Sequence, residues 1–441
     1  MSVSLTMTEA REAATAADQS RASLWRNRDY TILWAGEAFS SLGTSMSLFT
    51  YPLIGYALTH STSRAALAGA AFALGGAVFR LPAGALVDRW HRKVVMVASE
   101  GVGALIYASL AVAGLLHVLT LPHLVIAAFL TGAAGTFYDP AETAAIRSAV
   151  PAEQLPTAFS QNQARQHLAS LLGPPVGGAL YALARLLPFV FDAFTYTVST
   201  LALTQLRTPL PAPAGRKTTT IRSDIVEGMR FMLSRGFLRA VVAFAALANV
   251  AFSALFLVIA LKLLQANVAP AAIGVVSAIG AVAGICGSFV APVVIRRTPT
   301  GVLTLAAGTL LFLSAVPMAF TDNVAIIGAL LGVALFAMPA GNAAILSYMS
   351  ATTPDRLQGR SLAALNFGAT GLEWLGPIAG GALMAAFGGQ VAMLGAAALL
   401  ALSIVPLLLN AEARTLPRPD RWPHRREVDP PATPLLADAP A

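Results

Sequence analysis

Three charged side chains of this sequence lie within apolar stretches, where they could take up and release a proton. Glu37, Arg80 and Glu100 each lie seven or eight residues from a charged end of their stretch. On helices with a rise of 1.5 Å per residue, they would share a depth of about 10 to 12 Å. A neighbouring arginine keeps a carboxylate ionised while burial favours its neutral form, and a proton-responsive switch needs that competition. We predict one cluster with Glu37 as the proton carrier; the alternative is a fixed ion pair, or side chains that extend to the lipid headgroups.

Two further acidic residues occur in apolar stretches. Glu373 lies thirteen residues past Arg360, about 20 Å along a helix, and we count it among the proton-coupling candidates. If it faces a central cavity, its carboxylate would favour cationic cargo; the alternative is a hydrogen bond to a neighbouring helix. Asp192 is expected to be an interfacial or helix-start group near the outer end of its stretch.

The sequence contains no motif in which nucleophiles, bases or metal ligands have the spacing of an enzyme active site. The lone cysteine, Cys286, has no partner for a disulfide or a thiolate metal cluster. The histidines lack the spacing of metal ligands and are scattered over His60, His91, His117, His123, His167 and His424. We therefore predict no catalytic residue, no metal site, no cofactor and no enzymatic activity, and a membrane-embedded enzyme is the least favoured alternative.

The composition shows what must position these residues. Of 441 residues, 56% are hydrophobic and 11% are charged, whereas soluble proteins carry about 25% charged residues. A bilayer-spanning helix needs about 20 apolar residues, so the chain is long enough for about a dozen. The net charge of +8 comes from arginines between apolar runs and not from one basic face, so nucleic-acid binding is not expected. The sequence predicts an all-α membrane protein.

Apolar runs between breaks of Pro, Gly and charge predict twelve transmembrane helices in two bundles of six. The first six are expected at 30–57, 65–87, 94–116, 121–138, 162–184 and 188–206, and the second six at 240–264, 271–295, 301–320, 323–349, 361–387 and 391–409. The domains would be a cytoplasmic tail (1–27), an N-terminal bundle (28–206), a cytoplasmic linker (207–239), a C-terminal bundle (240–410) and a disordered cytoplasmic tail (411–441).

The distribution of basic residues predicts the orientation. With the N-terminus in the cytoplasm, all but four of the 29 Lys and Arg residues fall in cytoplasmic segments or at the helix ends beside them. The exceptions are Arg64, Arg185 and Lys262, and Arg80 within the second span. The positive-inside rule therefore predicts a multi-pass protein of the cell membrane with both termini in the cytoplasm.

The linker contains a second feature. From Ser223 it has a basic amphipathic pattern, with Met229 and Met232 on one side and Arg230 elsewhere. This pattern suits a helix on a leaflet surface, and an ordinary connector helix is the equal alternative.

An internal repeat relates the two halves. Gly173-Pro174-Pro175-Val176-Gly177-Gly178 recurs as Gly376-Pro377-Ile378-Ala379-Gly380-Gly381, 203 residues later. Two copies in the same orientation indicate a transporter with its site between the halves. Proline removes a backbone hydrogen bond and glycine permits close approach, so we predict hinge or packing points at Gly173, Pro174, Gly177, Gly178, Gly376, Pro377, Gly380 and Gly381.

The junction of the second and third spans reads Gly84-Ala85-Leu86-Val87-Asp88-Arg89-Trp90-His91-Arg92-Lys93. It resembles the loop signature of the major facilitator superfamily, with His91 in place of the second glycine. The second half keeps Gly287 and the pair Arg296 and Arg297, but has Ala291 in place of the aspartate. The resemblance implies a cytoplasmic gate held by ion pairs, made of Gly84, Asp88, Arg89, Arg92 and Lys93; the alternative is that the basic residues only determine the topology.

Within this superfamily, the segment from Pro151 to Leu180 resembles the exporter branch that contains the enterobactin exporter and the macrolide efflux proteins. The resemblance implies a rocker-switch antiporter that exchanges protons for a small amphipathic molecule such as a drug, siderophore or secondary metabolite. The chain departs from many drug antiporters because residues 121–138 contain no arginine. The expected partners are a small-molecule substrate, protons and the lipid bilayer, with a monomer as the functional form. An importer of the same fold is the alternative.

Overall fold

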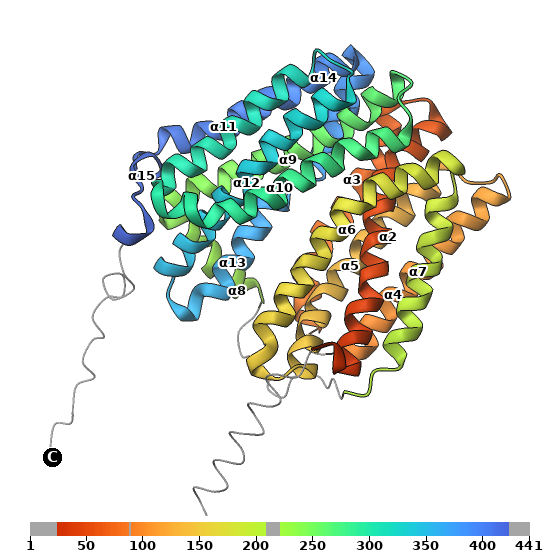
Figure 1. Cartoon of the computed structure of the whole chain (residues 1–441), viewed down its shortest axis with the longest axis horizontal. Coiled ribbons are helices and arrows are strands. Elements are labelled where there is room, and N and C mark those ends of the chain that lie inside the picture. The colour runs from red at the N-terminus through yellow and green to blue at the C-terminus, as the bar shows by residue number, and fades with distance from the viewer. Residues whose placement is uncertain (1–23, 88–89, 209–220, 423–441) are drawn as a thin grey trace, which may run out of the picture. The chain divides into compact units, whose positions relative to one another are not determined.

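The computed structural model describes residues 24–87, 90–208 and 221–422, and helices make up almost all of these ranges (Figure 1). The first half contains η1 (Leu24–Arg26), α2 (Arg28–Thr59), α3 (Thr62–Val87), α4 (Arg92–Leu115), α5 (Leu121–Ala149), η2 (Ala152–Gln154), α6 (Leu155–Leu183) and α7 (Leu187–Thr204). The second half contains α8 (Ile221–Ser234), α9 (Gly236–Gln265), α10 (Pro270–Arg297), α11 (Thr300–Met318), α12 (Val324–Thr352), α13 (Asp355–Thr370), α14 (Leu375–Leu409), α15 (Ala411–Thr415) and η3 (Pro419–Arg421).

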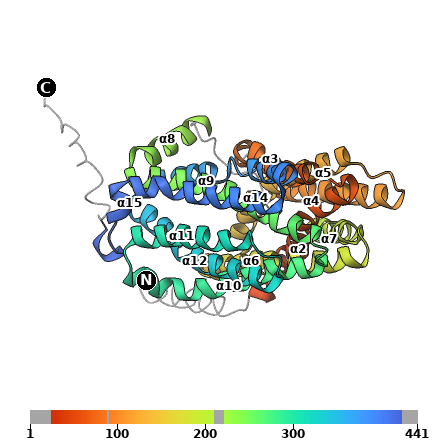
Figure 2. The ribbon, with the colours of Figure 1, turned by 90° about the horizontal axis from the view of Figure 1, so that it is seen from above.

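The helices form two compact units. The first comprises Met1–Arg216 with Ala260–Ala278, and the second comprises Lys217–Ile259 with Ile279–Ala441. In the first unit α2 is the central helix, because it packs against α3, α5, α6 and α7. In the second unit α11 runs beside both α12 and α14, as Figure 2 shows from above.

Local sequence explains where several helices begin. The side chain of Asn27 accepts a hydrogen bond from the backbone N–H of Tyr30 (3.1 Å) and caps α2. Asn323 caps α12 in the same way through Ala325 and Ile326. Such caps satisfy backbone donors that a helix start leaves without partners. Proline occupies the first turn of α5, α6 and α7, where its missing N–H costs nothing.

Nine helical stretches in the described part of the chain are long and apolar enough to cross a membrane. Two long helices, α2 and α6, are not among them because they carry more polar residues. The stretch Arg360–Leu409 is interrupted at Gly388, whose φ of 84° belongs to the left-handed region that glycine adopts readily. These two polar helices and this break account for the difference from the twelve predicted spans.

The structure corrects two sequence-based expectations about element boundaries. The span predicted at 361–387 is broken by a turn at 371–374, between α13 and α14. The tail predicted to be disordered from residue 411 continues as α15 and η3, because Asn410 caps α15 and the Glu412 carboxylate accepts from the Phe237 N–H (3.0 Å). Residues 423–441, 1–23 and 209–220 lie outside the described ranges.

The linker helix predicted from Ser223 is α8, and it packs against α13. Met232 is buried in the hydrophobic core of the second unit. Glu227 of α8 forms an ion pair with Arg360 of α13. These contacts favour the connector helix over a helix that lies on a lipid leaflet.

Helices α3 and α5 cross closely at two glycines. A Cβ atom on Gly132 would overlap the carbonyl oxygen of Phe72, and a Cβ atom on Gly75 would overlap that of Phe129. Without glycine at these positions, the two backbones could not approach each other this closely.

We expect Gly132→Ala to lower the free energy of unfolding by about 1 to 3 kcal/mol, because the new methyl group must push α3 and α5 apart. Gly135 lies one turn later on α5, and a Cβ atom there would meet nothing within 4 Å. Gly135→Ala is therefore the matched control and should not destabilise the protein. Thermal unfolding of the purified variants measures both effects. Equal stability of the two variants would contradict this account of the crossing.

Candidate functional site

A buried ion pair lies between α5 and α6. The guanidinium of Arg165 donates two hydrogen bonds to the carboxylate of Glu142, at 2.7 Å and 3.2 Å. Both side chains are only 3% exposed. A bidentate arginine–carboxylate pair is the strongest charge-assisted hydrogen-bond arrangement that two side chains can form. It fixes the orientation of Arg165 inside the bundle.

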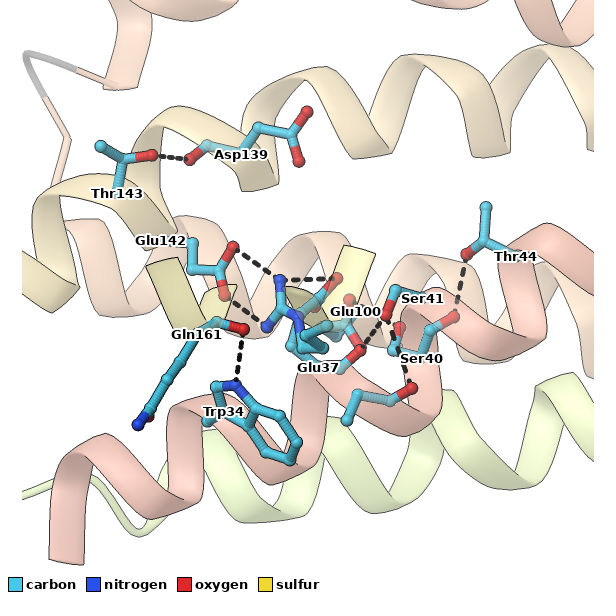
Figure 3. Close-up of polar contacts among 12 residues, drawn as sticks. Trp34, Glu37, Ser40, Ser41, Thr44, Glu100, Asp139, Glu142, Thr143 and Gln161 are labelled. Atoms are coloured by element: carbon cyan, nitrogen blue, oxygen red, sulfur yellow. Dashed lines mark hydrogen bonds and ion pairs between the residues drawn. The ribbon is translucent and has the colours of Figure 1, made fainter. Parts of the chain in front are cut away.

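Two more carboxyl groups lie beside this pair, as Figure 3 shows. Glu37 on α2 is 12% exposed, and its Oε1 lies 3.9 Å from Nη2 of Arg165. Glu100 on α4 is 4% exposed and accepts a hydrogen bond from Ser40 Oγ at 3.2 Å. In each of these two glutamates, the second oxygen (Oε2) is buried without a hydrogen-bond partner in the described part of the chain.

The charges of this cluster do not balance. The guanidinium of Arg165 lies within 4 Å of the Glu37 and Glu142 carboxyl groups, and the third carboxyl group, of Glu100, is held by Ser40. A buried charge is costly unless it is paired, and Glu142 already takes the best donor geometry of the arginine. The remaining two acids therefore need either a proton or a change in the position of Arg165.

Hydrogen bonds from α2 position the helix that carries the arginine. Tyr30 Oη donates to Oε1 of Gln161 (2.8 Å), and Trp34 Nε1 donates to the Gln161 carbonyl oxygen (3.2 Å). Gln161 lies one turn before Arg165 on α6. These contacts hold the start of α6 against α2 and bring Arg165 to the level of Glu37.

The structure brings together two of the three residues predicted to cluster. Glu37 and Glu100 lie in one site, but the cation beside them is Arg165. Arg80 is exposed on α3 and interacts electrostatically with Asp139 of α5. The structure therefore places both predicted acids in one site and puts Arg165 beside Glu37 as the nearest cation.

Sequence reasoning missed Arg165 because the polar start of α6 resembles a helix end. A signal was nevertheless present. Arg165, Ala169, Gly173 and Gly177 follow one another at intervals of four, which places them on one face of a helix. All four are buried. Counting back from Gly177 toward the N-terminus in steps of four residues reaches Arg165.

The comparisons with known proteins agree with this architecture. A family model described as Major Facilitator Superfamily matches residues 33–372, which is most of the chain. The chain belongs to the major facilitator superfamily. It is a transporter embedded in a membrane, as the members with solved structures are.

Relatives of this facilitator include efflux proteins. The multidrug efflux pump Tap of Mycolicibacterium fortuitum is 27% identical over 85% of this chain and 92% of its own length. Macrolide efflux protein A of Streptococcus pyogenes is 28% identical over 42% of this chain. That alignment spans 46% of the macrolide protein, so the chain matches about half of that relative's length.

Solved structures share the fold. The nucleoside transporter NupG superposes with a TM-score of 0.71 at 11% identity, covering 85% of this chain and 98% of NupG. A bacterial homologue of the iron transporter ferroportin, in its inward-facing state, gives a TM-score of 0.69 at 16% identity, covering 87% and 98%. At these identities the likeness establishes the major facilitator fold alone.

The gate predicted for this facilitator is described only in part. Asp88 and Arg89 lie outside the described residues, Gly84 belongs to α3, and Arg92 begins α4. The ammonium group of Lys93 donates to the carbonyl oxygens of Thr204 and Leu206, both at 2.8 Å. Lys93 therefore satisfies carbonyl groups at the end of α7, where a positive charge is also favourable.

The two glycine–proline motifs lie in different surroundings. In the first unit Gly173 and Gly177 pack against Ser45 and Met46 of α2, within the uninterrupted helix α6. Gly178 lies close to the backbone of Pro270.

The second motif begins directly after the helix break. There Gly376 and Gly380 of α14 pack against α9. Pro377 has no N–H to donate to the Glu373 carbonyl four residues earlier. The Gly376 N–H and Ser253 Oγ of α9 both donate to that oxygen, each at 3.0 Å. Packing is thus evident in both motifs, and a hinge role for their prolines and for Gly381 stays a prediction.

Two further acidic residues, Glu373 and Asp192, were expected within long continuous helices. Glu373 belongs to the turn at 371–374 and is half-buried. Asp192 lies in the second turn of α7 and is fully buried against α2. The hydroxyl group of Ser47 on α2 donates a hydrogen bond to its carboxylate.

Proposed function

We propose that this transporter is a proton-coupled exporter, in which the cluster of Glu37, Glu100, Glu142 and Arg165 couples proton movement to cargo movement. The excess of buried carboxyl groups over guanidinium groups supports this proposal most strongly. The names of two relatives, a macrolide efflux protein and a multidrug efflux pump, support export.

The coupling would work through the charge of the cluster. With all three carboxyl groups ionised and one guanidinium, the cluster carries two excess negative charges. Protons on Glu37 and Glu100 would remove both charges and with them much of the penalty for burying the site. Arg165 is 3.9 Å from Glu37 and bidentate with Glu142, so loss of a proton from Glu37 would draw the arginine toward α2.

The cargo in this proposal is a small amphipathic molecule, of the kind represented by drugs, siderophores and secondary metabolites. A cationic cargo would suit a transporter with excess buried carboxyl groups, and Glu373 is the proposed acidic residue facing the cargo. We further propose that the protein lies in the cell membrane with both termini in the cytoplasm and functions as a monomer. The proposed gate, made of Arg92 and Lys93 with Asp88 and Arg89, would lie on the cytoplasmic side. An importer of the same fold is the second candidate, since the fold does not set the direction.

The proposal predicts that cargo accumulates in everted membrane vesicles only when their interior is acidic. The vesicles would contain the full chain, and a fluorescent lipophilic cation would serve as the probe. Accumulation should stop when a protonophore is added, because protons leaving the vesicle provide the driving force. Vesicles without the protein are the control for passive partition of the probe. Accumulation that persists with the protonophore, or that requires an alkaline interior, would contradict proton-driven export.

A further inference from the structure

Asp192 is the most deeply buried acidic side chain among the described residues of the first unit. It is 0% exposed and lies in the second turn of α7. Its Oδ2 accepts a hydrogen bond from Ser47 Oγ of α2. Its Oδ1 is buried without a hydrogen-bond partner in the described part of the chain. The coupling cluster of the proposed function does not include it.

The packing around Asp192 leaves room for the carboxyl group and little else. A Cβ atom on Gly43 of α2 would overlap Oδ1, so glycine at this position makes the space. Thr195 Oγ1 donates to the Asp192 backbone carbonyl at 3.0 Å, which leaves the carboxyl group to the partners on α2.

The ionisable groups that face Asp192 are tyrosines. They are Tyr51 on α2, Tyr107 on α4 and Tyr196 on α7 itself. Tyr107 lies 5.3 Å from Tyr196 between ring centroids. Helix α6 also packs against α7, but its Tyr181 hydroxyl donates to the Leu53 carbonyl. In the described ranges, no ion pair to Asp192 is seen.

An ionised carboxylate in this position would be unfavourable. A charge placed in an apolar interior needs an opposite charge or several hydrogen bonds, and a neutral tyrosine provides no positive charge. The protonated acid removes this cost and gains an O–H that can donate to a neighbouring oxygen. The packing therefore favours Asp192 with its proton.

Polar residues on one face of α2 connect Asp192 with the coupling cluster. Glu37, Ser40, Thr44 and Ser47 follow at intervals of three, four and three residues, which is the spacing of one helix face. Ten residues of helix span about 15 Å. Each of the three hydroxyl residues has a partner across the interface: Ser40 contacts Glu100, Thr44 contacts Tyr196 at 2.6 Å, and Ser47 contacts Asp192.

Tyr196 lies between the two acidic sites. Its hydroxyl group pairs with Thr44 Oγ1, and it interacts electrostatically with both Glu100 and Asp192. A phenol can donate one proton while it accepts another, so it can pass a proton without a lasting charge.

We propose that Asp192 is a second proton-binding carboxyl group of the transport cycle, and that it exchanges its proton with Glu100 across Tyr196. In this step the O–H bond of Asp192 breaks and an O–H bond of Glu100 forms. The Tyr196 hydroxyl gives up one proton and receives another, so it is unchanged at the end. Asp192 becomes a carboxylate as Glu100 becomes neutral. This inference rests on the proposed function, because it places Asp192 on the path of the driving ion.

The first test is infrared difference spectroscopy of the lipid-reconstituted protein during pH steps. A protonated carboxyl group has a carbonyl stretching band of its own. We expect Asp192→Asn to remove one such band, and Ser47→Ala to shift that band because it removes the hydrogen bond to Oδ2. An unchanged spectrum in Asp192→Asn would overturn the proposal. Ser47→Ala keeps the test decisive if the asparagine variant does not fold.

The second test measures transport in the same proteoliposomes. We expect Asp192→Asn and Tyr196→Phe each to slow gradient-driven transport by about 5-fold or more, with unchanged affinity for the fluorescent cation. Thr197 is exposed on α7 and its hydroxyl bonds its own helix, so Thr197→Val is the matched control. If the gradient drives transport by the wild type and Asp192→Asn transports at the same rate, the role of Asp192 is refuted while the proposed function stands. If wild type ignores the gradient, the proposed function fails, while the infrared band still reports whether Asp192 holds a proton.

Discussion

Arg165→Met is expected to lower the free energy of unfolding by about 3 to 5 kcal/mol, the usual cost of leaving one member of a buried ion pair alone. The reason lies in the geometry of the pair. Glu142 is 3% exposed and receives two hydrogen bonds from this guanidinium, so methionine would leave its carboxylate buried without them. Chemical or thermal unfolding of the detergent-solubilised protein measures the loss.

Two further variants separate the charge effect from a packing effect. Arg147 is on the same helix as Glu142 but is exposed, so Arg147→Met should change stability by no more than about 0.5 kcal/mol. The double variant with Arg165→Met and Glu142→Met removes both charges and should recover most of the lost stability. A double variant as unstable as the single one would mean that methionine does not fit the site, and that the ion pair is not the cause.

Glu37→Gln should abolish the dependence of transport on the proton gradient while the protein still folds. Glutamine has nearly the same shape as glutamate but cannot gain or lose a proton near neutral pH. Glu37 is 3.9 Å from Arg165, so the substitution also removes the charge that competes with Glu142 for the guanidinium. Since coupling free energies between sites are typically 1 to 3 kcal/mol, gradient-driven accumulation should fall by about 5- to 150-fold.

The matched control is Glu153→Gln, because Glu153 is an exposed acid in the 3-10 helix before α6. It changes the net charge of the protein by the same amount but lies outside the cluster. Downhill counterflow of the labelled cargo, which needs no gradient, should survive in Glu37→Gln. Gradient-driven accumulation at the wild-type rate in Glu37→Gln would remove Glu37 from the mechanism.

The sequence predicts the fold better than it predicts the site. Apolar runs and the 203-residue repeat indicate a membrane transporter of two helical bundles, because hydrophobic length and glycine packing are local properties. The position of Glu37 and Glu100 also follows from local counting along their helices. Their cation could not be found in this way, because Arg165 reaches the cluster from a helix whose polar start hides its true length.

Asp192 and Glu373 illustrate two other limits. The hydroxyl group that contacts the Asp192 carboxylate belongs to Ser47, 145 residues away, and no local pattern shows which helix faces which. The turn before Gly376 is held from outside by Ser253 of α9, which donates a hydrogen bond to the Glu373 carbonyl across the helix interface. The burial of Asp192 and the turn that contains Glu373 both depend on tertiary contacts, which the periodicity of a single helix does not reveal.

The polarity of α2 and α6 has a consequence for biogenesis. Neither helix is apolar enough to be counted as a membrane span by itself, because polar and charged side chains such as Glu37 and Arg165 face other helices and not lipid. A helix of this kind gains little from entering the bilayer alone as it leaves the ribosome. We therefore expect the helices that follow α2 to help retain it in the membrane, so that its insertion depends on the assembly of the bundle.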